Sequence, residues 1–135
     1  MFKKNLYPLF LFILIACNSE DYIPETYVNF SIQASEIGGV GNAVYTNQDY
    51  GVNGIIIYHK DINEYLAFER TCSYEPSESC AIVELNDIYN PTILIDSCCG
   101  SSFFLDDGTP IQGPALLPLK LYNTSYDGVY VNVYN

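Results

Sequence analysis

Apolar and polar residues alternate along most of the chain with the two-residue period of β-strands, and no segment keeps the 3.6-residue period of an amphipathic helix. Residues 27–32 place Val28, Phe30 and Ile32 on one face, with polar residues between them. The apolar run at residues 54–58 suits a core strand. Further strands are predicted at residues 64–69, 81–85, 92–95, 103–105 and 129–134.

Short polar segments separate these strands. The segments Asp61-Ile62-Asn63, Asp106-Asp107-Gly108 and Tyr126-Asp127-Gly128 have turn composition, and Asp-Gly is a common hairpin pair. The glycine-rich stretch at residues 38–41 is not followed by a helical pattern, which argues against a phosphate-binding loop. Strands joined by short turns predict an all-β fold, either an antiparallel sandwich or a small barrel.

The first residues differ from the rest of the chain. A basic start is followed by an apolar stretch over residues 6–15, which is shorter than the roughly 20 residues needed to span a bilayer. The sequence Leu14-Ile15-Ala16-Cys17 resembles the lipobox of bacterial lipoprotein signals. We therefore predict a signal peptide at residues 1–16, acylation of Cys17, and a lipid bilayer as the partner of the acyl chains.

The residues after Cys17 are polar and acidic. Residues 17–25 are predicted to form a lipidated tether, and residues 26–135 a single domain. Glu20 and Asp21 resemble the acidic sorting signal of surface lipoproteins in the Bacteroidetes. These features predict a lipid-anchored, extracytoplasmic protein of the cell envelope in the outer membrane, with surface display as a suggestion.

The chain is strongly acidic, with 16 acidic residues, five Lys and Arg, and a formal net charge of −11. After removal of the signal peptide, only Lys60, Arg70 and Lys120 remain as strong bases. Such a charge repels nucleic acid and anionic lipid surfaces, so neither is an expected partner. The predicted partner besides the bilayer is an envelope protein of unknown identity.

Four cysteines remain besides the anchor: Cys72, Cys80, Cys98 and Cys99. An even number in an exported domain predicts disulfides. Neighbouring side chains of an extended backbone point in opposite directions, so Cys98 and Cys99 are expected to face different partners. A structural zinc site is the competing interpretation, but the usual spacing of two to four residues between paired cysteine ligands is absent.

Two stretches resemble the Rieske iron–sulfur family. Gly54-Ile-Ile-Ile-Tyr58 and then Glu64-Tyr-Leu-Ala-Phe-Glu-Arg-Thr-Cys72 resemble the approach to its first cluster-binding loop. Cys99-Gly-Ser-Ser-Phe103, Asp107-Gly108 and Gly113-Pro-Ala-Leu-Leu-Pro-Leu119 are similar to its second loop and the segment that follows. The resemblance covers roughly residues 50–135. It implies a Rieske-like antiparallel β-sandwich with two loops at the cluster-binding end.

The ligand positions depart from the family pattern. A Rieske centre uses two Cys on one iron and two His on the other. Where the first loop of the family reads Cys-x-His, this chain has Cys72 followed by Tyr74. Where the second loop reads Cys-x-Cys-His, Asp96 replaces a ligand Cys and Cys99 replaces a ligand His. The single histidine, His59, lies outside both loops, at the end of a predicted strand, so a cluster with two imidazole ligands is impossible within this chain.

The resemblance also implies a disulfide pairing. Some Rieske proteins join their two loops by a disulfide, and the matching cysteines here are Cys98 and, a few residues late, Cys80. That pairing leaves Cys72 and Cys99 facing each other in the ligand positions, to form a second disulfide or to remain thiols. A disulfide between distant loops typically contributes about 2–4 kcal/mol.

Three functions are compatible with these residues. The first is a non-redox binding or structural module without metal or cofactor, favoured because three of the four ligands are lost while the scaffold motifs remain. The second is an electron carrier with a non-standard 2Fe-2S cluster on Cys72 and Cys99, completed by Asp96 or Tyr74. Enzymatic activity is not expected, since a single histidine in a strand supports neither a Ser-His-Asp nor a Cys-His arrangement.

The third function is thiol–disulfide exchange through Cys72, Cys98 and Cys99. It requires a cysteine whose pKa is depressed. Arg70 is the only basic residue near these cysteines in the sequence.

Overall fold

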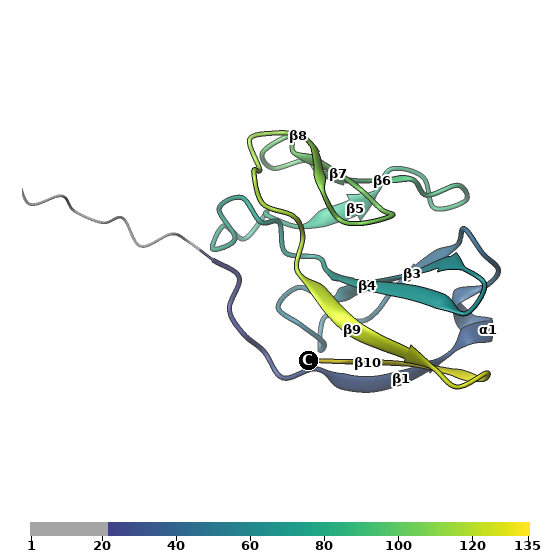
Figure 1. Cartoon of the computed structure of the whole chain (residues 1–135). Helices are drawn as coiled ribbons and strands as arrows, with labels where there is room; N and C mark the ends of the chain where they lie inside the picture. The colour runs from purple at the N-terminus through teal and green to yellow at the C-terminus, as the bar shows by residue number, and fades with distance from the viewer. Residues whose placement is uncertain (1–21) are drawn as a thin grey trace, which may run out of the picture.

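The computed structural model describes residues 22–135, so the predicted signal peptide and Cys17 lie outside the described residues. The described chain forms two antiparallel sheets (Figure 1). The order of the six-stranded sheet is β1-β10-β9-β4-β3-β2, and that of the four-stranded sheet is β5-β6-β7-β8. The strands are β1 (Asn29–Gln33), β2 (Ala43–Tyr45), β3 (Ile55–Asp61), β4 (Glu64–Glu69), β5 (Val83–Leu85), β6 (Ile93–Asp96), β7 (Ser102–Phe104), β8 (Pro110–Gln112), β9 (Leu121–Tyr126) and β10 (Tyr130–Tyr134).

The only helix among residues 22–135 is α1 (Ala34–Ile37), a single turn after β1. None of the helical structure in that range is long and apolar enough to cross a bilayer. The predicted antiparallel all-β sandwich is confirmed.

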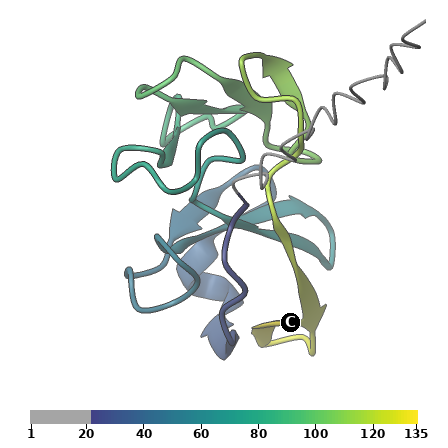
Figure 2. The ribbon, with the colours of Figure 1, turned by 90° about the vertical axis from the view of Figure 1, so that its left-hand side faces the viewer.

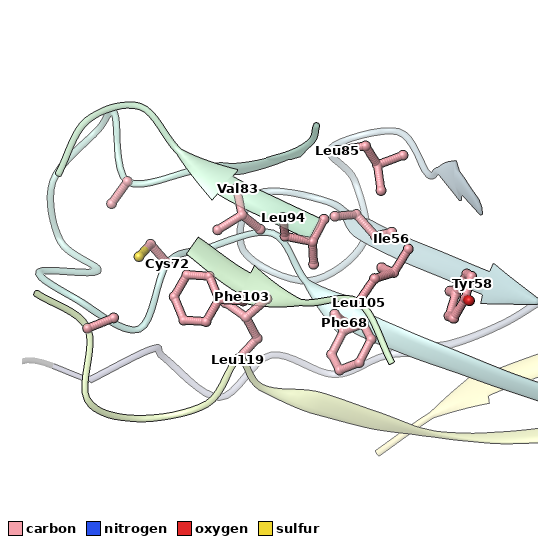
Figure 3. Close-up of a cluster of buried hydrophobic side chains, with 12 residues drawn as sticks. Ile56, Tyr58, Phe68, Cys72, Val83, Leu85, Leu94, Phe103, Leu105 and Leu119 are labelled. Carbon is pink, nitrogen blue, oxygen red and sulfur yellow. The ribbon is translucent and has the colours of Figure 1, made fainter. Parts of the chain in front are cut away.

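The strands are stacked in layers, with β3 and β4 in the middle (Figure 1). Along β3, Ile56 and Tyr58 face the four-stranded sheet, whereas Ile55 and Ile57 face the other way, toward β9 and β10. Because successive side chains of β3 point to opposite sides, this strand contributes apolar side chains to two cores. This explains why residues 54–58 are apolar without interruption. Figure 3 shows the core under the four-stranded sheet, whose fully buried members include Phe68, Leu94 and Phe103.

The apolar strands agree with the sequence prediction. β4 has the predicted bounds, and β1 and β3 begin within two residues of theirs. β2, β8 and β9 were not predicted. β9 pairs with both β4 and β10, but it carries Asn123, Thr124 and Ser125, and only Tyr122 in it is buried. Its position in the sheet comes from its pairing and not from an apolar face.

The predicted turns are confirmed at both Asp-Gly pairs. Asp127 Oδ1 accepts hydrogen bonds from the backbone N–H of Val129 (2.8 Å) and Tyr130 (2.7 Å) between β9 and β10. Gly108 follows β7 with a φ of +75°, and a Cβ there would lie 2.7 Å from the ring of Phe68. Glycine is therefore required at residue 108 both by the turn and by the core packed against it.

Part of the expected tether lies against the domain. Ile23 is only 9% exposed, and the Glu25 carboxylate pairs with Lys120 Nζ at 2.8 Å. Residues 22–25 run along the same end of the molecule as the connection from β8 to β9 (Figure 2). Residues 22–25 of the predicted tether therefore pack against the domain, where Ile23 covers an apolar surface.

Candidate functional site

Two loops meet at the end of the sandwich along which residues 22–25 and the connection from β8 to β9 run. The first loop (residues 70–82) joins β4 to β5, and its base is closed by a bridge between Thr71 and Ile82. The second loop (residues 97–101) joins β6 to β7, and its base is closed by a hydrogen bond from Asp96 N to Ser101 O at 2.9 Å. Every predicted ligand position lies in these loops or at the end of β6, which ends at Asp96.

A disulfide ties the two loops together. Cys80 in the first loop is bonded to Cys98 in the second, with 5.5 Å between the Cα atoms. This is the pairing that the family resemblance implied. Both residues are exposed, so the bond joins the loops at their surface.

Beneath the disulfide, Cys72 Sγ, a carboxylate oxygen of Asp96 and Cys99 Sγ all lie within 4.8 Å of one another. We call these three residues the Cys72–Asp96–Cys99 cluster. Cys72 and Asp96 are fully buried, while Cys99 is half-buried. The Cys99 thiol donates to Asp96 Oδ2 at 3.2 Å, and Ser101 Oγ lies 3.1 Å from Cys99 Sγ, within hydrogen-bond distance. The cluster therefore has a buried side and a side that reaches solvent through Cys99.

The second candidate disulfide, between Cys72 and Cys99, is not formed, and both residues are free cysteines. Each thiol instead hydrogen-bonds to the Asp96 carboxylate. Of the two alternatives left open by the sequence, the thiols are favoured here because the buried carboxylate needs donors and the two thiols are the side chains placed to supply them.

The protonation of Cys72 bears on the thiol–disulfide hypothesis. Burial raises the pKa of the Cys72 thiol well above its ordinary value, and the neighbouring Asp96 and Cys99 raise it further, against an opposing hydrogen bond from the backbone of Tyr74. Thiolate is the nucleophile in disulfide exchange. Cys72 is therefore a poor attacking thiol.

A third segment closes over the two loops. It contains the Gly113-Pro114-Ala115 motif, and Ala115 N donates to Ser101 Oγ at 2.9 Å. Ser73 Oγ in the first loop donates to Leu117 O at 2.7 Å. Sequence reasoning did not single out Ser101, although it lies within the second-loop motif. It is fully buried and connects Cys99 to the third segment.

Tyr74, the remaining ligand position, and His59, the single histidine, are not part of the Cys72–Asp96–Cys99 cluster. Tyr74 is half-buried against the core under the four-stranded sheet, and its pKa is raised, first by the adjacent Glu75 carboxylate. His59 lies in β3, where its Nδ1 is 2.8 Å from Gly38 O and its ring stacks on Tyr65 at 4.2 Å. His59 is therefore a strand residue with a hydrogen-bonded and stacked ring.

The two sheets and the loops at one end define a Rieske ferredoxin-like fold. Among solved structures, the ferredoxin of carbazole 1,9a-dioxygenase from Nocardioides aromaticivorans IC177 is similar with a TM-score of 0.52 and 17% identity, over 82% of this chain and 98% of that chain. A chain in the complex of reduced oxygenase and oxidised ferredoxin in carbazole 1,9a-dioxygenase is similar with a TM-score of 0.53 and 20% identity, over 78% of this chain and 92% of that chain. No protein-family model matches the sequence, and no curated protein matches it.

The residues present do not fit a Rieske cluster. Such a cluster needs two imidazole ligands on one iron, and His59 is stacked and hydrogen-bonded in β3. Asp96, at a position where the family has a ligand Cys, offers a hard carboxylate in place of a soft thiolate.

Proposed function

We propose that the chain is a lipoprotein of the cell envelope, anchored in the outer membrane through acylated Cys17, and that its Rieske-like domain serves as a non-redox binding or structural module. The observation that carries the proposal is the set of side chains at the four ligand positions. They are Cys72, Tyr74, Asp96 and Cys99.

Contacts between the loops support the proposal, because they can hold this end of the domain together without a cluster. The Cys80–Cys98 disulfide and the hydrogen bond from Ser73 to Leu117 O already hold the loops together. Beneath them, the core that contains Phe68 and Phe103 is fully buried. A metal cluster is therefore not needed to close this end of the sandwich.

The anchor would hold the loop end close to the bilayer. Tyr22, the first described residue, lines a groove of about 410 Å³ together with Tyr74 and Leu117. Only five residue steps separate Tyr22 from Cys17, and an extended chain covers at most about 18 Å in that length. The loops therefore face the anchored side, and a partner would meet them near the membrane surface.

The second candidate function is an electron carrier with a non-standard 2Fe-2S cluster. The convergence of Cys72, Asp96 and Cys99 favours it, since these are iron-ligating residue types. A 2Fe-2S centre also requires a fourth protein ligand besides these three residues. Tyr74 would have to supply it as a phenolate, and a hard phenolate oxygen matches a soft iron–sulfur cluster less well than a thiolate does.

Reconstitution with iron and sulfide under anaerobic conditions separates the two. We expect the wild-type protein to show no visible charge-transfer bands and no electron paramagnetic resonance signal after reduction. The matched control is a triple variant, Tyr74→His, Asp96→Cys and Cys99→His, which restores the family's ligand pattern and should acquire a cluster. Cluster bands in the wild-type protein would refute the proposal in favour of the electron carrier.

A further inference from the structure

We propose that the Cys72–Asp96–Cys99 cluster binds one zinc ion through its two sulfurs and one carboxylate oxygen, with the fourth coordination position left to water. The proposal rests on the proposed absence of an iron–sulfur cluster, since one site cannot hold both. No metal was expected from the sequence, because the usual spacing of paired cysteine ligands in a zinc motif is absent. The fold brings them together from two loops.

The donor set suits zinc. Zn²⁺ binds thiolate sulfur at about 2.3 Å and carboxylate oxygen at about 2.0–2.2 Å, and three protein ligands with one water is a common arrangement for an open site. Those bond lengths place tetrahedral ligand atoms about 3.5–3.8 Å apart. The three atoms already lie within 4.8 Å of one another, and Asp96 Oδ2 is 3.2 Å from Cys99 Sγ. Binding needs only small shifts, in which Asp96 Oδ2 and Cys99 Sγ move slightly apart and any wider separation within the cluster closes.

The small number of strong hydrogen-bond donors to the Asp96 carboxylate also favours a bound cation. Glu69 is the other fully buried carboxylate among residues 22–135. It accepts hydrogen bonds from the hydroxyls of Thr71 and Tyr122, and from the backbone N–H groups of Val52, Asn53 and Thr71. Asp96, in contrast, accepts one backbone N–H, from Cys98 at 2.8 Å, and its other donors are the thiols. Thiols are weak donors, so Asp96 is much less well compensated than Glu69.

No basic side chain of the described chain reaches Asp96. Lys60 pairs with Glu64, Arg70 with Glu84, and Lys120 with Glu25. These are the only lysines and arginines in residues 22–135. A buried carboxylate without a cationic partner is costly. A divalent cation between Asp96 and the two sulfurs would remove that cost.

Loading the site keeps its charge constant. Before binding, two neutral thiols and one carboxylate carry a charge of about −1. Zinc binds the two thiolates, and the two thiol protons leave to solvent, so two bonds to hydrogen are exchanged for two bonds to zinc. Two thiolates, one carboxylate and Zn²⁺ again sum to about −1. The low-dielectric site therefore accepts the ion without gaining net charge, and no oxidation or reduction is involved.

The test uses the full chain in detergent, purified anaerobically so that the thiols stay intact, and stripped of metal with a chelator. Zinc is added, unbound metal is removed by gel filtration, and bound zinc is measured by mass spectrometry. We expect about one zinc per chain. Cobalt in place of zinc should give the intense visible bands of tetrahedral coordination together with thiolate charge-transfer bands.

Cys99→Ser and Asp96→Asn each remove one ligand and should weaken zinc binding at least about 100-fold, since losing even an outer-shell partner costs about 10–100-fold. The matched control is the double variant Cys80→Ser/Cys98→Ser, which removes two sulfurs outside the cluster and should still bind one zinc. Circular dichroism of the metal-free variants checks that they fold.

Absence of bound zinc in the wild-type protein, or equal binding in the folded ligand variants, would overturn the zinc site and leave the proposed function standing. Stoichiometric iron and sulfide bound at the same residues would overturn both proposals.

Discussion

The Cys80–Cys98 disulfide gives the sharpest stability prediction. Its cysteines are 18 residues apart in the sequence and both are exposed, so replacing them with serine removes the cross-link without opening a cavity. The chain-entropy relation gives about 3 kcal/mol for a closed loop of roughly this length. For a domain of this size the loss corresponds to a decrease in melting temperature of about 10–15 °C.

The assay is urea unfolding of the wild-type protein and of the Cys80→Ser/Cys98→Ser variant, followed by circular dichroism without reductant. The control is Cys99→Ser, which removes a thiol that forms no disulfide and should cost far less. Titration of the unfolded, unreduced wild-type protein should find two free thiols, from Cys72 and Cys99. A destabilisation below about 1 kcal/mol would refute the role of the disulfide in joining the loops, and the absence of free thiols would refute the free state of Cys72 and Cys99.

Three further predictions follow from other parts of the molecule. Phe68→Ala should destabilise the domain by about 3–5 kcal/mol in chemical denaturation, because Phe68 is fully buried between the sheets; a loss below 1 kcal/mol would contradict this packing. Hydrogen bonds, first from the Tyr130 backbone, lower the pKa of Asp127, so its stabilising contribution is complete above about pH 4 and is lost as the pH falls through the lower folded value. Melting curves across this range should therefore show a smaller acid-induced loss for Asp127→Asn than for the wild-type protein, and identical losses would count against the turn. Cys17→Ala should move the protein from the membrane fraction to the soluble fraction, and unchanged membrane association would refute the predicted anchor.

The strands that could be predicted from the sequence are those whose own residues show an apolar run or an apolar–polar alternation. β3 and β4 were found because Ile55 to Tyr58 and Tyr65 to Phe68 fill cores on both sides of one layer. β9 was missed because its neighbours in the sheet, and not its own side chains, decide its conformation. Pairing between residues far apart in the sequence leaves no local pattern from which it could be predicted.

The candidate site was predicted in its residues but not in its chemistry. Motif comparison located Cys72, Tyr74, Asp96 and Cys99 because the surrounding glycines and prolines of the family are retained. It left the state of Cys72 and Cys99 open, between a disulfide and two thiols. That choice depends on where the Asp96 carboxylate points after both loops have folded, and on the lack of a basic side chain beside it. Neither can be derived from spacing in the sequence.

We propose above that this Rieske-like domain works without an iron–sulfur cluster. The most direct test is the iron and acid-labile sulfide content of the full-length protein, purified anaerobically from cells grown with ample iron. We predict far less than stoichiometric iron and sulfide, and no increase on supplying more iron to the cells. Equal, stoichiometric amounts of iron and sulfide that are lost in Cys72→Ser would contradict the claim and assign electron transfer to the domain.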